Sequence, residues 1–174
     1  MIIEKYNIKL KTVEYEDAEL IVDLRTDVNK SKFLSSTAND LELQKEWIRT
    51  YKEKEKNGSE YYFVAIDERN EKFATYRIYN LEDDICEIGS WVSKPGYSNG
   101  KNSIKVDIIV KEFVFGFLNY HKLKFVVHKE NFSVVRYHKL FGPEIIEETQ
   151  ENLYFVLSKK NFIENRDRIF KNIK

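Results

Sequence analysis

The sequence predicts an α/β fold with one mixed, mostly antiparallel sheet of about seven strands flanked by helices. Strand-like and helix-like segments follow one another in an order that is neither a regular strand–helix alternation nor an all-strand chain. That order favours a mixed sheet with helices on both faces. The chain has 174 residues, of which 42% are hydrophobic, enough for one core. We therefore expect a single domain over residues 1–174.

The first part of the chain predicts a strand and two helices. Residues 1–10 interleave charged and apolar side chains, a strand pattern rather than that of a signal peptide, and residues 7–13 alternate as a half-buried strand does. Residues 16–28 carry apolar side chains at helical spacing. Asp40 is a favoured N-cap for a second helix, which ends near Asn57 because glycine follows.

Three strands come next, at residues 60–67, 72–81 and 84–93. Short polar turns join them, so we expect an antiparallel meander. The first of the three is apolar on both faces, which indicates a place in the middle of the sheet.

The second half begins at Pro95 and Gly96, which end the preceding strand. A long helix is predicted after them, over residues 102–120. Apolar side chains lie on two sides of this helix, so we expect other elements to pack against both sides. The remaining segments predict a strand, a short helix, a closing hairpin and a polar C-terminal helix, at residues 123–129, 131–141, 143–149 with 152–160, and 161–174.

Charge and composition exclude several classes of function. Lys and Arg together number 29, as do Asp and Glu, so the formal net charge is zero. The chain therefore lacks the excess of positive charge that is typical of nucleic-acid-binding proteins. Cys86 is the only cysteine, which excludes an intramolecular disulfide and favours a reducing, cytoplasmic location. Residues 104–118 are too short and too charged to cross a bilayer, so we expect no membrane partner. The three histidines and the cysteine lack the spacing of metal ligands.

Two motifs in the second half carry a resemblance to a known family. Residues 87–95 (EIGSWVSKP) look like a strand that runs E-x-G-x-W-x-x-x-P into a cofactor loop. Asn131, Val134, His138 and Gly142 look like the conserved positions of a short helix that follows. With the order of elements, both motifs resemble the GNAT family of N-acetyltransferases, over nearly the whole chain. The resemblance implies that this fold has splayed fourth and fifth strands, here residues 84–93 and 123–129.

The first half is similar to a narrower group within that family. Residues 24–25, 44–48 and 60–64 resemble GNAT proteins of surface-polysaccharide pathways, which acylate amino sugars carried on nucleotides. One departure stands out in the pyrophosphate loop, which in the family follows the pattern Q/R-x-x-G-x-G/A. If Gly100 is its first glycine, Tyr97 takes the Q/R position and Asn102 the final one.

The resemblance implies acetyl-CoA, or another acyl-CoA, as co-substrate and assigns residues to it. The backbone of the fourth strand would bond the pantetheine arm and polarise the thioester carbonyl, at Trp91, Val92 and Ser93. A loop that leads into a helix N-terminus offers N–H groups to the pyrophosphate, at Asn99, Gly100, Lys101, Asn102 and Ser103. The alternative for this loop is an ordinary turn with a helix cap. Asn131 is a favoured N-cap and, by resemblance, also a contact of the pantetheine arm.

Two side chains are candidates for proton transfer. His138 lies close to Asn131 on the helical wheel and stands where many family members carry a tyrosine that protonates the departing thiolate. The alternative is a histidine that is buried in the core and makes its hydrogen bonds there. Glu87 resembles a carboxylate that relays the amine proton through water, and strand alternation places it on one face with Trp91. The alternative for Glu87 is a cross-strand partner of Arg77.

The acceptor side is predicted from aromatic and hydroxyl residues near the first two helices and the central strands, namely Phe33, Ser35, Thr37, Tyr61 and Tyr76. We expect an acyltransferase acting on a small-molecule amine, a nucleotide-linked amino sugar. The alternatives are a protein N-terminal acetyltransferase and a catalytically silent binding domain. Homodimer formation stays open.

Overall fold

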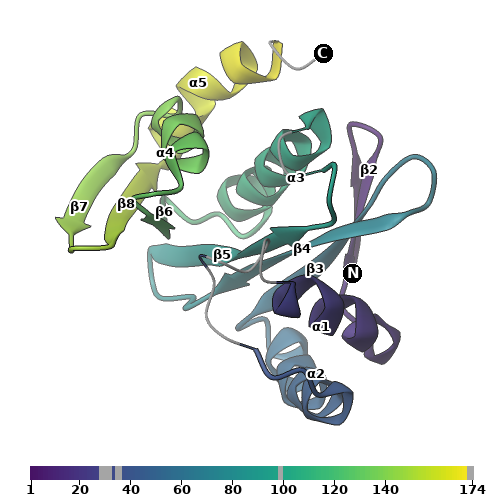
Figure 1. Ribbon diagram of the computed structural model, residues 1–174. Coiled ribbons are helices and arrows are strands. Elements are labelled where there is room, and N and C mark those ends of the chain that lie inside the picture. The colour runs from purple at the N-terminus through teal and green to yellow at the C-terminus, as the bar shows by residue number, and fades with distance from the viewer. Residues whose placement is uncertain (28–32, 34–36, 98–99, 172–174) are drawn as a thin grey trace.

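The computed structural model describes residues 1–27, 33, 37–97 and 100–171 (Figure 1). Its strands form one sheet of eight strands in the order β1-β2-β3-β4-β5-β6-β8-β7. Neighbouring strands are antiparallel except for β5 and β6, which are parallel. The predicted mixed, mostly antiparallel sheet is therefore confirmed. The strands are β1 (Ile2–Lys5), β2 (Ile8–Thr12), β3 (Tyr61–Ile66), β4 (Lys72–Tyr79), β5 (Ile85–Ser93), β6 (Lys122–His128), β7 (Glu144–Glu148) and β8 (Asn152–Ser158).

The additional strand arises at the N-terminus, where one strand was expected over residues 7–13. Tyr6 and Asn7 both adopt positive φ angles, 56° and 62°, and so turn the chain between β1 and β2. Two successive positive φ angles are typical of the tight turns that join hairpin strands. The alternation of residues 1–10 therefore belongs to two strands rather than to one.

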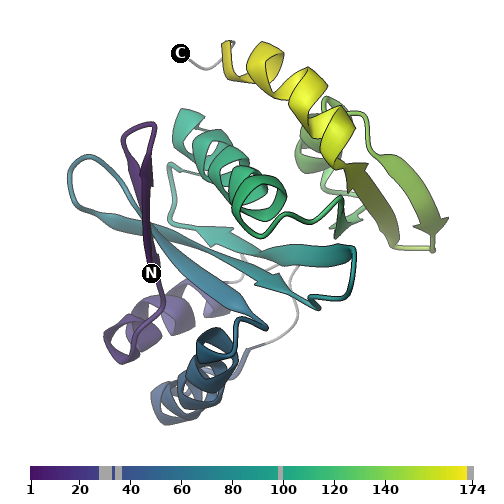
Figure 2. The same ribbon diagram turned by 180° about the vertical axis from the view of Figure 1, so that it is seen from behind.

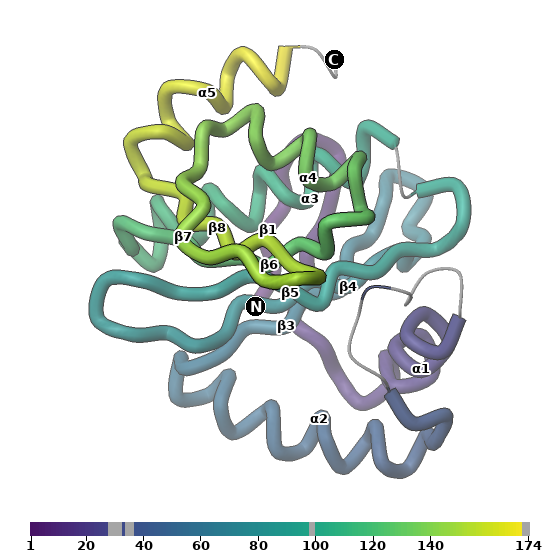
Figure 3. Tube along the Cα trace, turned by 60° about the vertical axis from the view of Figure 1, so that its left-hand side comes forward, coloured from purple at the N-terminus to yellow at the C-terminus, as the bar shows by residue number. Residues whose placement is uncertain are grey.

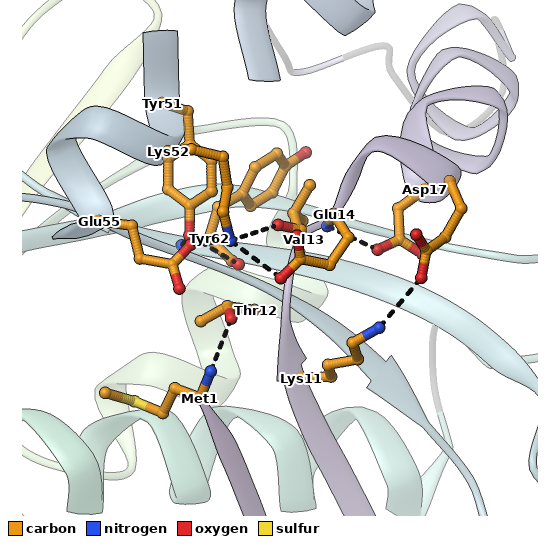
Figure 4. Close-up of polar contacts among 11 residues, drawn as sticks. Met1, Lys11, Thr12, Val13, Glu14, Asp17, Tyr51, Lys52, Glu55 and Tyr62 are labelled. Atoms are coloured by element: carbon orange, nitrogen blue, oxygen red, sulfur yellow. Dashed lines mark hydrogen bonds and ion pairs between the residues drawn. The ribbon is translucent and has the colours of Figure 1, made fainter. Parts of the chain in front are cut away.

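Two helices cover one face of the sheet, α1 (Ala18–Thr26) and α2 (Leu41–Lys56), with a short 3-10 turn η1 (Tyr15–Asp17) before α1. Asp40 caps α2 as predicted, since its carboxylate accepts from the backbone N–H groups of Glu42 and Leu43. Figure 4 shows how α2 is fastened to the sheet. Lys52 donates to the carbonyl of Val13 (3.4 Å), and the Tyr51 hydroxyl accepts from the backbone N–H of Tyr62 (2.9 Å).

The opposite face carries α3 (Lys101–Glu112), which continues through a π-helical turn η2 (Phe113–Phe117), together with α4 (Phe132–Lys139) and α5 (Lys159–Lys171). Figure 3 shows α1 and α2 below the sheet and the other helices above it. Strand β3 is buried on both faces between these layers, as the sequence predicts. The larger hydrophobic cluster lies on the α3 side and the smaller one on the α1–α2 side.

The C-terminal helix α5 is more firmly attached than its polar sequence suggests. Phe162 and Ile169 are buried, and the Phe162 ring lies 5.2 Å from the ring of Phe115 at the end of the α3 segment. Figure 2 shows α5 running alongside α3 above the β8 end of the sheet. Among the described residues, no helix is long and apolar enough to cross a membrane.

Candidate active site

The sheet splits where β5 and β6 diverge. Their pairing is limited to the register Ile85–Lys122, Cys86–Leu123 and Glu87–Lys124. Beyond Glu87 the two parallel strands separate, as the family resemblance implies. The β5 edge from Ile88 onward therefore faces a gap instead of a strand, and its peptide groups can accept a ligand as an additional strand.

A β-bulge in β5 shapes this edge. Between Thr75–Val92 and Arg77–Gly89 the register gains one residue on β5, and Ser90 takes a positive φ of 55°. A bulge of this kind reverses the side to which the following residues point. Trp91 accordingly lies on the α3 face, with its ring 5.3 Å from that of Tyr76. The expectation that Glu87 and Trp91 share a face is therefore wrong.

A slot of about 310 Å³ lies at the split, between β5, β6 and the start of α4. Trp91, Val92 and Ser93 line it, as predicted for the pantetheine-binding strand, and so does Asn131. Asn131 precedes α4, but its side chain makes no capping hydrogen bond within the described chain. Asn131 thus holds the N-cap position as predicted, but its side-chain oxygen accepts from the Ser133 hydroxyl (3.4 Å) instead of capping the helix. Its contact with the pantetheine arm stays a prediction.

A second cavity of about 230 Å³ lies on the α3 side of the split. It shares Tyr76, Trp91 and His138 with the slot and extends to Gly100 and Ser103 at the start of α3. Gly100 is the N-cap of α3, and no acidic residue stands in the first turn to neutralise the helix dipole. This end of the cavity is therefore suited to an anion.

The loop before α3 differs in detail from the sequence prediction. Gly100 has a φ of −90°, a backbone conformation that does not require glycine. Lys101 and Asn102 lie in the first turn of α3, whereas Asn99 falls outside the described residues. Tyr97, at the Q/R position of the family pattern, donates its hydroxyl to Asp67 (2.8 Å) instead of facing the cavity.

His138 is held in the wall that the two cavities share. The residue is 8% exposed, and its Nδ1 is buried without a hydrogen-bond partner among the described residues. The alternative of a satisfied core histidine therefore does not fit. Burial, reinforced by the Lys111 ammonium, lowers the pKa of His138 to about 3. The ring is thus neutral at physiological pH, and its role in protonating the departing thiolate stays a prediction.

Glu87 takes a different position from the one expected. Its carboxylate accepts from the Tyr79 hydroxyl (2.9 Å) and from the Asn80 amide (3.2 Å). Arg77, the partner considered for it, instead donates to Glu60. Glu87 is the last residue of β5 that pairs with β6, and it lines neither of the two cavities at the split.

The predicted acceptor residues are divided between three places. Phe33 lines the slot and stacks on His128 at 4.7 Å, and Tyr76 lines both cavities at the split. Thr37 lines a separate pocket on the α1–α2 side. Tyr61 packs edge-on against Phe113 in the core and lines none of these cavities. Ser35 lies outside the described residues.

That separate pocket, of about 310 Å³, lies between α1, α2 and strands β3 and β4. Two arginines and an aromatic side chain stand out in its wall, Arg25, Arg77 and Trp47. The Arg77 guanidinium lies 4.9 Å from the Trp47 ring centroid. Arg77 also pairs with Gly89 across the β4–β5 ladder, and Gly89 lines the slot, so the pocket begins one strand away from the split.

Sequence reasoning missed a buried polar group in the wall of the second cavity. Asp107 accepts hydrogen bonds from the Tyr76 hydroxyl (2.8 Å), the Tyr137 hydroxyl (2.6 Å) and the Lys111 ammonium. The only sequence signal was the presence of an acid and a base four residues apart within an apolar helix. No group of three potential metal ligands occurs in the part of the chain that the structure describes.

Comparison with known proteins identifies the family. The model of the acetyltransferase (GNAT) domain matches residues 7–142, more than half of the chain. This chain belongs to the GNAT acetyltransferase family. It is therefore an acyl-CoA-dependent N-acyltransferase. No curated protein sequence shows significant similarity to it.

Solved structures agree with this assignment. FdhC, described as a nucleotide-linked sugar GNAT, superposes with a TM-score of 0.87 at 28% identity, covering 100% of this chain and 99% of FdhC. The ribosomal-protein-S5-alanine acetyltransferase of Vibrio fischeri reaches 0.79 at 12% identity, covering 91% and 97%. The spermidine N-acetyltransferase of Vibrio cholerae, in complex with CoA and spermine, reaches 0.77 at 15% identity, covering 91% and 99%. The last two likenesses show the fold alone.

Proposed function

We propose that this enzyme transfers an acetyl or other short acyl group from acyl-CoA to the primary amine of a nucleotide-linked amino sugar. The observation that carries the proposal is the slot at the β5–β6 split. Its wall combines side chains of the α3 face, Tyr76 and His138, with Phe33 and His128 from the α1–α2 side. A thioester and an amine that approach from opposite faces of the sheet can therefore meet there.

The residues present fit acyl-CoA. The β5 edge at Trp91, Val92 and Ser93 offers peptide groups to the amides of the pantetheine arm. The N-terminus of α3, with Gly100 at its cap, offers N–H groups and a positive dipole to the pyrophosphate. Asn131 adds an amide that no capping bond engages in the described chain. Acyl-CoA itself supplies the activated acyl group.

Two observations support a nucleotide-linked acceptor. The pocket beside the slot combines arginines, which suit phosphate groups, with the half-buried ring of Trp47, on which a base can stack. It begins one strand away from the split, about 5 Å across the sheet, so one extended molecule can reach both. FdhC, a nucleotide-linked sugar GNAT, matches the chain over its full length.

His138 is the proposed group for proton exchange. A neutral imidazole accepts a proton on one nitrogen and donates from the other, so it suits a reaction in which the amine loses a proton and the thiolate gains one. Its buried Nδ1 without a partner is the kind of polar atom that a substrate satisfies. A part for Glu87 in relaying the amine proton through water stays a prediction.

The test is an acceptor screen that follows thiol release from acetyl-CoA. We expect turnover with at least one amino-sugar nucleotide and none with a ribosomal N-terminal peptide or with spermidine. Trp47→Ala should raise the acceptor KM and leave the acetyl-CoA KM unchanged, because Trp47 lies in the acceptor pocket. Turnover with the peptide or spermidine alone would overturn the proposed acceptor, and the mass of the amide product checks the chemistry.

A further inference from the structure

Asp107 and Lys111 form a buried ion pair one turn apart on α3, and Asp107 lines the second cavity. The Lys111 side chain is 0% exposed and the Asp107 side chain 8%. Removing two charges from water is so costly that apolar residues of similar volume often stabilise a protein equally well. Stability alone therefore does not account for the pair.

The Asp107 carboxylate has a full set of donors from three elements. Tyr76 donates from β4, Tyr137 from α4 and Lys111 from α3. The Lys111 ammonium is otherwise enclosed by aromatic rings, at 4.6 Å from the Phe141 centroid and 5.6 Å from that of Tyr137. The carboxylate thus already has its one cationic partner.

His138 lies beside this pair without joining it. Its ring is 4.4 Å from that of Phe125 and 5.2 Å from that of Tyr137, and its Nδ1 has no partner among the described residues. The titratable groups around it are Asp107, Lys111, Tyr76 and Tyr137. A histidine near a buried carboxylate ordinarily becomes protonated and pairs with it. Here Lys111 occupies that place.

We propose that Lys111 is a positioning residue of the acyltransferase site, which serves as the cation for Asp107 and so keeps His138 unprotonated well below neutral pH. This inference rests on the proposed function. An imidazolium paired with Asp107 has no lone pair with which to take the amine proton, whereas a neutral ring has one. Burial is the largest cause that lowers the pKa of His138; the Lys111 ammonium lowers it further, whereas Asp107 raises it.

The first experiment neutralises Lys111. In Lys111→Met the carboxylate remains without its cation, so the pKa of His138 should rise by about one to three pH units. NMR titration of the histidine ring signals measures this directly, and His138→Phe assigns the signal. The acidic limb of the kcat/KM profile should move to higher pH by a similar amount. Lys111→Gln keeps a hydrogen-bond donor for Asp107 and serves as a second neutral variant if Lys111→Met folds poorly.

The second experiment removes the carboxylate as well. In Lys111→Met/Asp107→Asn nothing remains to attract a proton to His138, so its pKa and the acidic limb should return toward the wild type. At mildly acidic pH, below the shifted acidic limb of Lys111→Met, activity should therefore be higher in the double variant than in Lys111→Met. A purely structural pair would change melting temperatures but leave both pH profiles in place.

Either of two results would overturn the inference. One is a His138 titration in the neutral Lys111 variants that matches the wild type. The other is a double variant that titrates like Lys111→Met. The histidine titration needs no substrate, so it stands even if the acceptor screen finds no acyl transfer. Failure of the proposed function and failure of this inference are thereby distinguished.

Discussion

His138 contributes ring nitrogens to the wall that the two cavities share. His138→Phe fills the same space without a ring nitrogen, so kcat at saturating acetyl-CoA should fall by about 10²–10⁴-fold. His138→Ala should fall similarly in kcat and also melt earlier, because it leaves a cavity. Thiol release and melting temperatures measure both effects. Near-native turnover by His138→Phe would end the assignment to proton exchange.

The burial of His138 also makes stability depend on pH. Its pKa falls from 6.5 to about 3 on folding, so below pH 6.5 the unfolded chain binds a proton that the folded chain refuses. Stability is therefore lost as the pH falls from 6.5 toward 3, by at most about 1.4 kcal/mol per pH unit. Denaturant titrations at several pH values should show a shallower acid loss in His138→Phe. Equal slopes would mean that folding leaves the pKa of His138 at its ordinary value.

Individual residues were predicted unevenly from the sequence. The position of His138 near Asn131 follows from the 3.6-residue period, and both do line the slot. The spacing of Asp107 and Lys111 was too weak a signal to predict their burial, because polar residues within an apolar helix are normally solvent-facing. Their burial depends on Tyr76 and Tyr137, which come from elements far away in the sequence.

At the scale of elements, the bulge in β5 decides which side chains meet. Alternation alone places Trp91 with Glu87, but the extra residue at Ser90 moves Trp91 to the α3 face beside Tyr76. The positive φ of 55° at Ser90 is set by tertiary packing, and no glycine stands at that position to mark it in the sequence. The bulge could therefore not be predicted. By contrast, the N-cap of α2 at Asp40 was predictable because it uses only local chemistry.

The start of α3 gives an element-level prediction. Gly100 has a negative φ, and the nearest atom to an added Cβ would be the Tyr97 carbonyl oxygen at 3.7 Å. Gly100→Val should therefore change the apo melting temperature little, yet weaken acetyl-CoA binding about tenfold or more by obstructing the phosphate site. Gly116→Val, in the π-helical continuation of α3, is the matched control. Calorimetry that finds equal affinity in the two variants would remove α3 from the cofactor site.

For the whole molecule, the order of elements was predictable because each one carries its own period and its own turn. The meander, the long helix and the closing hairpin β7–β8 all appear where expected. The N-terminal hairpin was missed because the turn at Tyr6 and Asn7 contains neither glycine nor proline. The separation of β5 from β6 came from the family resemblance, since no local pattern reports how far two strands pair.

The arrangement of the cavities indicates from which face of the sheet each substrate enters. The cavity at the start of α3 lies on one face of the sheet, the arginine-lined pocket lies on the other, and the slot connects the faces. Acyl-CoA is expected to enter from the α3 side and the acceptor from the α1–α2 side. Their reacting groups would then meet beside His138.

A crystal structure of the enzyme with CoA and an amino-sugar nucleotide tests this account most directly. It should show the pantetheine arm in the slot, hydrogen-bonded to the backbone of Trp91–Ser93, with the CoA sulfur and the acceptor amine both close to His138. The phosphates should lie at the start of α3 and the nucleotide base against Trp47. CoA bound elsewhere, with the slot filled only by water, would contradict the account.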